Sequence, residues 1–400
     1  MRSKSLTFLN NWLPAIVLLL IFISEGVGKY YEFYYGTGFG FQKYLKAFLF
    51  VGFAGLLLKN AVDLIAPIGL MGLFLIGQVF LPGGMEPDVV ISGFKFIFPI
   101  LLFIYFNRNR MTAVSRENFF KSFEWVMIIN AFLIVVGLIG SVFIFQSYAG
   151  PRWGYNGLFL NTAGSSYVYS IAFFYFLLRY KHRFLTSWKT WLVIITALLT
   201  GTKIIYISLL ASVMAYIFFF LKISENKKKL IGLSVFLITA IGFYIIFFQI
   251  GFFGNLSRQQ GLQSAIFSFR NDTLRELTLP FIENTWSWIN YLFGGINDLN
   301  TRSEFGLLDL CYYYGIVGGL AFLFVYKKTF IIFPLNNLVL FTLATFIFII
   351  FLAGNFFENG SLAAFVLLLR EILLKYEEDK EIQIQNHEHM RSAIKNTASF

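Results

Sequence analysis

The 400-residue sequence has one cysteine and three histidines, and each shortage excludes a class of site. The single cysteine, Cys311, has no partner for an intrachain disulfide and rules out a metal cage built from thiolates. His182, His387 and His389 are too scattered to form a metal site. There is no glycine-rich nucleotide fingerprint and no P-loop. We therefore expect neither a metal nor another cofactor.

Charged residues are also scarce, because the chain is strongly apolar. Hydrophobic residues make up 58% of it, charged residues only 13%, and 52 residues are phenylalanine. The mean hydropathy is +0.70. A soluble domain of this length is far less apolar, so the bilayer must be the solvent for much of the chain. The sequence predicts an all-α multi-pass membrane protein.

The apolar runs predict about twelve transmembrane helices, since a span needs roughly 20 apolar residues. The predicted spans are 11–28, 41–59, 61–82, 92–107, 123–147, 165–180, 188–201, 203–222, 230–253, 306–326, 330–353 and 356–376. They form one polytopic domain over residues 1–376, and residues 377–400 are expected to be a polar, mobile tail. The first apolar run, Leu13–Ile23, is followed by no small-residue cleavage site and is expected to remain as a signal anchor.

The basic residues predict how the chain is oriented. With the N-terminus inside, roughly two thirds of the 32 basic residues fall in inner loops, while the 21 acids divide almost evenly. Essentially the whole net charge of +11 is then a topology signal, and no nucleic acid is expected as a partner, since that would need one basic face. An even number of spans puts both termini in the cytoplasm. No histidine then faces outside, which removes the commonest general base from that side.

The few cations left on the outer side mark candidate binding residues. One patch, Gly150–Gly157, holds Arg152, Trp153 and Tyr155, and Asn161 follows it. Its aromatic rings can stack on sugars, its amides can bond sugar hydroxyls, and its guanidinium can bind an anion. The alternative is an interfacial loop whose aromatic residues belong to the membrane belt.

Lys203 lies at the outer tip of a predicted hairpin that turns at Thr200-Gly201-Thr202. Its position breaks the positive-inside pattern, which favours phosphate binding. The alternative is that its ammonium only reaches up to the membrane interface.

The longest connection, 254–305, is expected to be an external loop with short helices before the last three spans. Loops of this length are usually functional. Arg270 begins a predicted helix there, where free N–H groups add affinity for anions. Thr273 and Glu276 fit a capping box, and Pro280 is expected to end the run. Three further candidate binding residues in or beside this loop are Arg258, Arg275 and Arg302.

Two carboxylates follow this loop. Glu304 opens the tenth predicted span, and Asp309 lies more than one turn inside it, where a charge costs about 2.5 kcal/mol or more. Because they are five residues apart, they face different sides of a helix. Asp309 is expected to meet Tyr312 or Tyr313. The alternatives are a favourable helix N-terminus for Glu304 and a structural hydrogen bond for Asp309.

These residues carry a resemblance to a known family. The segments are Leu292–Gly295, Ser303–Leu310, Tyr314–Gly318 and Gly201–Lys203, with Arg152 ahead of Asn161 and Gly164. With about twelve spans and a large outer loop before the last three, the chain resembles bacterial O-antigen or capsule repeat-unit polymerases of the Wzy type over nearly its whole length.

The resemblance implies a metal-independent glycosyltransferase of GT-C-like architecture in the bacterial inner membrane. It would join the glycan of one undecaprenyl pyrophosphate to the sugar of another lipid-linked repeat unit. Arg152, Lys203 or Arg270 would stabilise the pyrophosphate, and Glu304 or Asp309 would accept the acceptor's proton. Tyr313 would contact substrate. The implied protein partners are a chain-length regulator and a flippase of the same pathway.

Three other functions stay open. An O-antigen ligase shares the architecture but typically uses an outward histidine, which this chain lacks. A flippase or transporter predicts charges spread through many spans, whereas mid-span charge here is expected to be nearly confined to Asp309. A structural scaffold would not explain the outer arginines.

Overall fold

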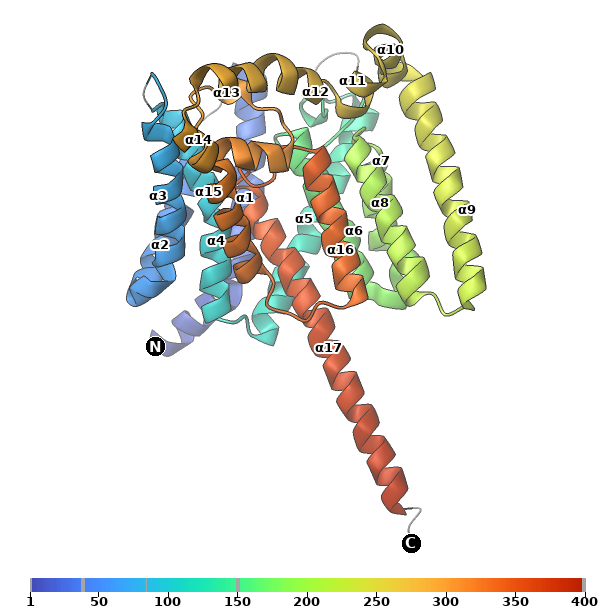
Figure 1. The fold of residues 1–400 in the computed structure, drawn as a ribbon. Helices are drawn as coiled ribbons and strands as arrows, with labels where there is room; N and C mark the ends of the chain where they lie inside the picture. Colours follow the sequence, from blue (N-terminus) through green and yellow to red (C-terminus); the bar gives the residue numbers. More distant parts are fainter. Residues whose placement is uncertain (1, 37–39, 84, 149–151, 398–400) are drawn as a thin grey trace.

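The computed structural model describes the backbone of residues 2–36, 40–83, 85–148 and 152–397, and the side chains of these residues except 2–9, 247 and 387–397. Over that part of the chain the fold is all-helical, and the β-pairing is one isolated bridge between Gln146 and Tyr155. Gly150 and Pro151, in the first predicted patch, lie outside the described residues. The two chain termini lie at one end of the helical bundle, and the short helices α10 to α13, whose bounds are given below, lie across the opposite end (Figure 1).

The long helices follow the apolar runs. Those before the large loop are α1 (Arg2–Tyr35), α2 (Phe41–Leu57), α3 (Ile65–Val79), α4 (Pro87–Arg108), α5 (Ala113–Gly140), α6 (Thr162–Tyr180), α7 (Trp188–Leu198), α8 (Lys203–Ala215) and α9 (Glu225–Tyr244). Those after it are α15 (Gly306–Phe330), α16 (Asn337–Leu352) and α17 (Leu362–Thr397). Each of the twelve predicted spans overlaps one of these helices.

The predicted external loop contains short helices, as expected. They are α10 (Gly251–Gln260), α11 (Leu262–Phe267), α12 (Arg270–Thr273), α13 (Leu279–Thr285) and α14 (Trp288–Phe293). Single π-helical turns extend α8 through Phe220 and α9 through Gln249 and join α12 to α13 over Leu274–Thr278. The 3₁₀ turns are Leu58–Leu64, Phe143–Phe145, Lys181–Thr186 and Leu299–Thr301.

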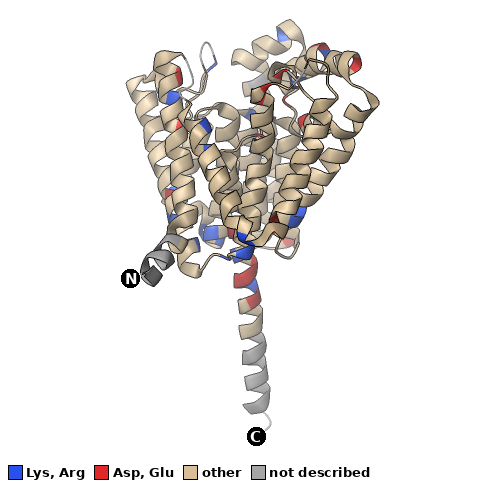
Figure 2. Ribbon diagram, turned by 90° about the vertical axis from the view of Figure 1, so that its left-hand side faces the viewer, with Lys and Arg blue, Asp and Glu red and all other residues tan. Residues whose placement is uncertain are grey.

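Within the part of the chain that the structure describes, six helical segments are long and apolar enough to cross a membrane. They are Asn10–Tyr35, Phe41–Val79 (which contains α2 and α3), Pro87–Arg108, Ala113–Gly140, Lys203–Phe220 and Gly306–Phe330. Charged residues gather toward the two ends of the bundle, and the helices between them are mostly uncharged (Figure 2). This arrangement is that of a helical multi-pass membrane protein.

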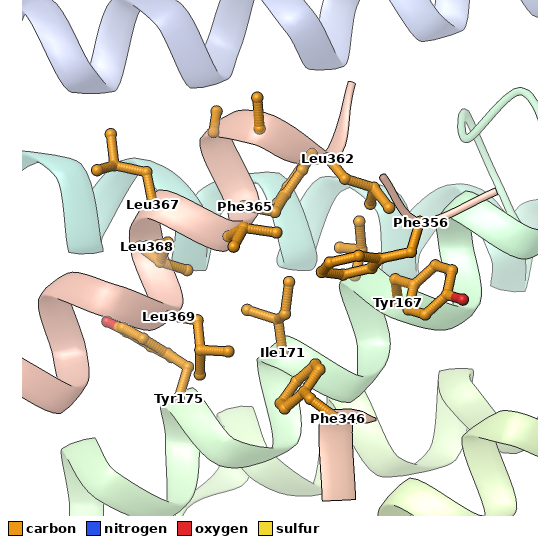
Figure 3. Packing of buried hydrophobic residues seen from close by; sticks show 14 of the residues in the cluster. Tyr167, Ile171, Tyr175, Phe346, Phe356, Leu362, Phe365, Leu367, Leu368 and Leu369 are labelled. Carbon is orange, nitrogen blue, oxygen red and sulfur yellow. The ribbon is translucent and has the colours of Figure 1, made fainter. Parts of the chain in front are cut away.

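Helix α6 forms the centre of the bundle. Every residue from Ser165 to Leu178 is buried, as expected for a helix that is covered on all sides. Tyr167, Ile171 and Tyr175 of α6 face the buried side chains of α17, among them Phe365 (Figure 3). On another side, the Ser170 hydroxyl lies 2.6 Å from that of Ser208 in α8. Such small polar contacts let transmembrane helices approach closely.

The expectation that mid-span charge is nearly confined to Asp309 is wrong. Within helices that contain predicted spans, the structure also buries Glu25 and Lys29 of α1, Glu124 of α5, and Arg370 of α17. Each has polar partners. The Tyr175 hydroxyl donates to Glu124 at 2.8 Å, and the Lys46 ammonium lies 3.3 Å from Glu25. Hydropathy did not reveal these buried charges, because a single charged residue barely lowers the mean hydropathy of a long apolar segment.

The neighbouring residues Arg370 and Glu371 connect α17 to α4 and α5. Its side chain has no exposed surface, and its guanidinium donates to Asn107 Oδ1 at 2.6 Å, to the Phe103 carbonyl at 3.2 Å and to Glu371 Oε1 at 2.7 Å. Glu371 also accepts from Arg116 of α5 at 3.2 Å. Beyond this network α17 continues as one helix through residues 377–397, which the sequence had suggested as a mobile tail, and it projects past the bundle (Figure 1).

We predict that Arg370→Ala lowers the free energy of unfolding by about 3–5 kcal/mol, because it leaves the buried Glu371 carboxylate without one of its two cationic partners. The control is Lys375→Ala, since Lys375 is partly exposed and pairs with Asp379 on the same helix at 3.2 Å. The control should change stability by less than about 1 kcal/mol. Thermal unfolding in detergent measures both, and equal midpoints would contradict the role of Arg370.

Candidate functional site

Two glycine contacts bring the first predicted patch onto the turn between α7 and α8. A Cβ on Gly154 would lie 2.3 Å from the Thr200 carbonyl oxygen, and one on Gly201 would lie 2.3 Å from that of Trp153. Gly201 also has φ +71, which favours glycine. The Tyr155 N–H donates to the Leu199 carbonyl at 2.8 Å. This packing places Arg152 at the tip that carries Lys203, with an Arg152 Nη2 to Gly201 carbonyl distance of 3.4 Å.

A buried lysine, which the sequence did not single out, fixes the base of this patch. The Lys29 ammonium of α1 donates to the Gly157 carbonyl at 2.7 Å, to the Gln146 carbonyl at 3.2 Å and to Asn156 Oδ1. From α5, the Asn130 side chain accepts from Leu158 N–H at 2.9 Å. The loop that carries Arg152 is therefore held by polar groups inside the bundle.

Arg152 and Lys203 share one aromatic ring. The Arg152 guanidinium carbon lies 4.8 Å from the ring centroid of Phe253 in α10, and the Lys203 ammonium lies 3.9 Å from it. The same guanidinium lies 3.7 Å from the Tyr148 ring centroid. Aromatic faces attract cations, so the rings hold both charges without neutralising them.

Arg270 completes this group. Lys203 donates to the Ala265 carbonyl, to the Ile266 carbonyl at 3.0 Å and to Ser268 Oγ at 3.3 Å, only two residues before Arg270. The charges of Arg152 and Lys203 both interact with that of Arg270. We call Arg152, Lys203 and Arg270 the Arg152 cluster.

The cluster has little counter-charge. Among the described residues, the carboxylate that pairs with it is Glu304, whose Oε2 lies 3.6 Å from Arg270 Nε. Burial lowers the pKa of Arg152, and Arg270 adds to this effect, whereas Tyr148 opposes it. Burial raises the pKa of Tyr148, so its hydroxyl stays neutral. Such a group of positive charges favours an anion of two or more charges.

Glu304 is held in an unusual conformation. Its φ is +59, which a residue with a side chain rarely adopts, and its side chain is 49% exposed. The Glu304 backbone packs closely on Gly354. Only glycine allows this approach, because a Cβ on residue 354 would lie 2.5 Å from the Glu304 carbonyl oxygen. A strained, exposed carboxylate beside a guanidinium is the kind of residue that active sites retain.

Asp309 has a different hydrogen-bond partner from the one expected. Its Oδ1 accepts from the Ser303 N–H at 3.0 Å and from the Ser303 hydroxyl at 2.8 Å, whereas the Tyr312 hydroxyl lies 2.7 Å from Thr301 Oγ1. Asp309 Oδ2 is buried and has no hydrogen-bond partner among the described residues. The charge of Asp309 interacts with Tyr312 and Tyr313, as expected, but its hydrogen-bond partner is Ser303, because the chain before α15 folds back over the helix start. Asp309 fixes the segment that carries Glu304.

The loop between α16 and α17, Ala353–Ser361, joins these parts. The Tyr167 hydroxyl of α6 donates to the Gly354 carbonyl at 3.2 Å, and Arg270 donates to the carbonyl of Leu352, just before the loop, at 3.0 Å. Arg302 donates to Asn355 Oδ1 at 3.1 Å and forms an ion pair with Glu358.

Three further candidates have local structural roles. Asn161 caps α6 by accepting from the Gly164 N–H at 2.6 Å. Tyr155 is buried and meets Trp153 edge to face, and the Trp153 ring itself is exposed. Tyr313 has no exposed surface and packs between the rings of Phe74 and Phe96. The structure thus leaves Trp153 accessible and places both tyrosines inside the protein.

Two arginines of the long loop are exposed and have no hydrogen bond to a cluster residue among the described residues. Arg258 is exposed and bonds within its own helix, to the Gly254 carbonyl at 3.2 Å and to Asn255 Oδ1 at 3.0 Å. Arg275 is also exposed. Both are matched controls for the clustered arginines.

Helix α12 begins at Arg270, as predicted, but the capping box is wrong. The Thr273 hydroxyl donates back to the Phe269 carbonyl at 3.2 Å, and the helix runs on through Leu274–Thr278 into α13. Pro280 lies in the first turn of α13 and does not end the run.

The glycine motifs behind the family resemblance meet each other. A Cβ on Gly294 would lie 2.5 Å from the Gly315 nitrogen, and one on Gly315 would lie 2.3 Å from the Phe293 nitrogen. Gly315 also breaks α15, with φ +66 and ψ −172. These glycines let the end of the large loop pack directly on the broken helix.

The described residues contain no group of three or more histidine, cysteine or carboxylate side chains that could hold a metal. The arrangement can therefore bind an oxyanion through side-chain cations and can hold a carboxylate beside it. Comparison with known proteins found no matching family model, no matching curated protein and no matching solved structure.

We predict that Glu304→Gly leaves the thermal unfolding midpoint unchanged or raises it by a few degrees, because glycine adopts φ +59 without strain. Glu304→Ala is the matched variant, since it also removes the carboxylate but keeps the strain, and it should melt below the glycine variant. If both variants destabilise the protein equally, the conformation of Glu304 is not strained.

Proposed function

We propose that this chain polymerises lipid-linked oligosaccharide repeat units at the outer face of the bacterial inner membrane. It would transfer the glycan of one undecaprenyl diphosphate to a sugar hydroxyl of a second lipid-linked unit. The observation that carries the proposal is the Arg152 cluster, in which Arg152 and Lys203 share the Phe253 ring, the charge of Arg270 interacts with both, and the strained Glu304 carboxylate lies 3.6 Å from Arg270. In this proposal helices α1–α9 and α15–α17 all cross the membrane in a GT-C-like arrangement, with both termini in the cytoplasm.

The transfer would break one bond and form one. The acceptor hydroxyl oxygen attacks the anomeric carbon of the donor sugar, while the bond from that carbon to the diphosphate oxygen breaks. The diphosphate leaves with the electron pair and remains on its lipid, and Glu304 accepts the hydroxyl proton and passes it to water. No nucleotide is consumed, because the donor already carries its leaving group.

The Arg152 cluster would act mainly on that leaving group. Charge grows on the diphosphate as the sugar departs, and cations fixed in advance stabilise that charge more strongly than water does. Arg152 and Arg270 can each bind phosphate oxygens with two N–H groups, whereas Lys203 adds a single-point charge. Trp153, the exposed ring of the same loop, offers a face for a sugar.

A flippase for the same lipid is the second candidate. The buried charges of α1, α5 and α17 favour it more than the sequence had suggested, because polar groups within spans often mark a transport path. A ligase remains a third possibility on the family resemblance alone.

We predict that Arg152→Ala and Arg270→Ala each abolish long-chain surface glycan and cause lipid-linked single units to accumulate. The loss follows from removing leaving-group stabilisation, which is typically worth about 10²–10³ in rate per donor. Arg258→Ala and Arg275→Ala, made in the same loop region, should leave the chain-length ladder normal. Glycan gels and immunoblots of membrane fractions measure both. Normal ladders in the two cluster variants would sink the electrostatic mechanism.

Deleting the gene separates the three functions. A polymerase leaves one repeat unit on the final carrier, a ligase leaves polymer on the lipid diphosphate, and a flippase leaves units on the inner leaflet. We expect the first outcome. The accumulated units from the deletion strain, incubated with purified protein in nanodiscs, should then yield dimers and free undecaprenyl diphosphate in equal amounts.

A further inference from the structure

A second group of cations lies beside the far end of the α16–α17 loop. It consists of Lys46 of α2, Lys95 of α4 and Arg302, and we call it the Lys95 cluster. A Cβ on Gly360 would lie 3.8 Å from Lys46 Cδ and 3.9 Å from Lys95 Cγ, so the two lysine stems flank the same point of the loop. Arg302 reaches the same loop through Asn355 and Glu358, and its charge interacts with that of Lys95.

The three cations of the Lys95 cluster have two carboxylate partners among the described residues, so one positive charge is not neutralised. Lys46 pairs with Glu25 at 3.3 Å, and Arg302 pairs with Glu358. Among the described residues, no side chain or carbonyl accepts a hydrogen bond from the Lys95 ammonium or forms an ion pair with it. Its charged neighbours include three cations, Lys46, Arg302 and Lys43. The carboxylate that faces it, Asp88, pairs with Lys43 at 3.5 Å.

Lys95 is also deep for an unpaired charge. Helix α4 begins at Pro87, so Lys95 lies two turns inside, about 12 Å along the axis. The sequence predicted that this span starts at residue 92, and it did not single out Lys95. A lysine without a partner at that depth costs free energy, and such residues usually serve a ligand.

Glu304 contacts one cluster and is close in sequence to a member of the other. Its carboxylate pairs with Arg270 of the Arg152 cluster, and Arg302 of the Lys95 cluster precedes it by two residues. The Gly354 backbone packs against Glu304, and Gly360 of the same loop lies close to both Lys46 and Lys95. The α16–α17 loop thus connects a base at this position to the second group of cations.

We propose that Lys46, Lys95 and Arg302 bind the diphosphate headgroup of a second lipid-linked substrate, while the Arg152 cluster binds the first. This assignment rests on the proposed function, because glycan transfer between two lipid carriers requires two diphosphates to be bound together. Lys95, which has no hydrogen-bond or ion-pair partner among the described residues, supplies the charge that the second headgroup would neutralise. Lys46 and Arg302 lie near Lys95. A bound diphosphate would compete with Glu25 for Lys46 and with Glu358 for Arg302.

The test counts bound lipids. Purified protein in phosphatidylcholine nanodiscs is titrated with undecaprenyl diphosphate, and the bound copies are counted by native mass spectrometry. We expect two copies on the unmodified chain and one on Lys95→Met, with at least a tenfold weaker second binding step. Arg152→Ala should also hold one copy, and the double variant should hold none. Lys43→Met is the matched control, because Lys43 is on α2, 63% exposed and paired with Asp88, and it should retain two.

Lys95→Arg tests whether the loss in Lys95→Met comes from misfolding or from the missing charge. Because it keeps the charge, it should retain the second lipid copy. One copy on the unmodified chain, or two copies on a folded Lys95→Met variant, would overturn the proposal. Replacement of the second copy by phosphatidylglycerol at equal concentration would also overturn it, because the site would then be a general lipid headgroup site.

The outcome is separable from that of the proposed function. If Lys95→Met loses one copy and the unmodified protein forms no glycan dimers from the isolated units, the second site stands and the polymerase fails. If Lys95→Met forms dimers at the normal rate, the second site fails and the polymerase stands.

Discussion

The hydrogen bonds from the Tyr167 hydroxyl to the carbonyls of Ala353 and Gly354 are the constraint on which the candidate site depends. They start from α6, the helix buried on every side, so their donor cannot move without repacking the core. The carbonyls that they orient belong to the loop that contacts Arg270, Glu304 and Arg302. A single rigid helix thus sets the positions of residues that are far apart along the chain.

Close backbone contacts between glycines build the rest of the site. Gly154 and Gly201 bring Arg152 to Lys203, and Gly294 and Gly315 bring the end of the large loop onto α15. No side chain fits at these four positions, because the neighbouring backbone lies within 2.5 Å of where a Cβ would be. The short motifs that resemble a polymerase family are therefore explained first by packing. Their chemical meaning comes from the charged residues that they position.

The sequence predicted the helices well, because a run of apolar residues long enough to span a bilayer is a strong signal. It also placed Lys203 on a turn and Arg270 at a helix start, since both depend on neighbours in sequence. It missed Lys29, whose acceptors Gln146 and Asn156 are more than a hundred residues away. It did not foresee that Ser303 is the hydrogen-bond partner of Asp309, and it did not single out Lys95, because hydropathy predicts neither the fold-back of a segment nor the residue at which a helix begins.

Helix α17 runs without a break for 36 residues, about 54 Å, from the loop beside Gly360 to a point well outside the bundle. Partway along, the buried Arg370 pins it to α4. The helix is embedded in the bundle from Leu362 to Leu373, where every residue is buried, and it projects beyond them. A protein that grips the projecting segment would therefore act on the same continuous helix that starts beside Gly360, at the opposite face of the molecule.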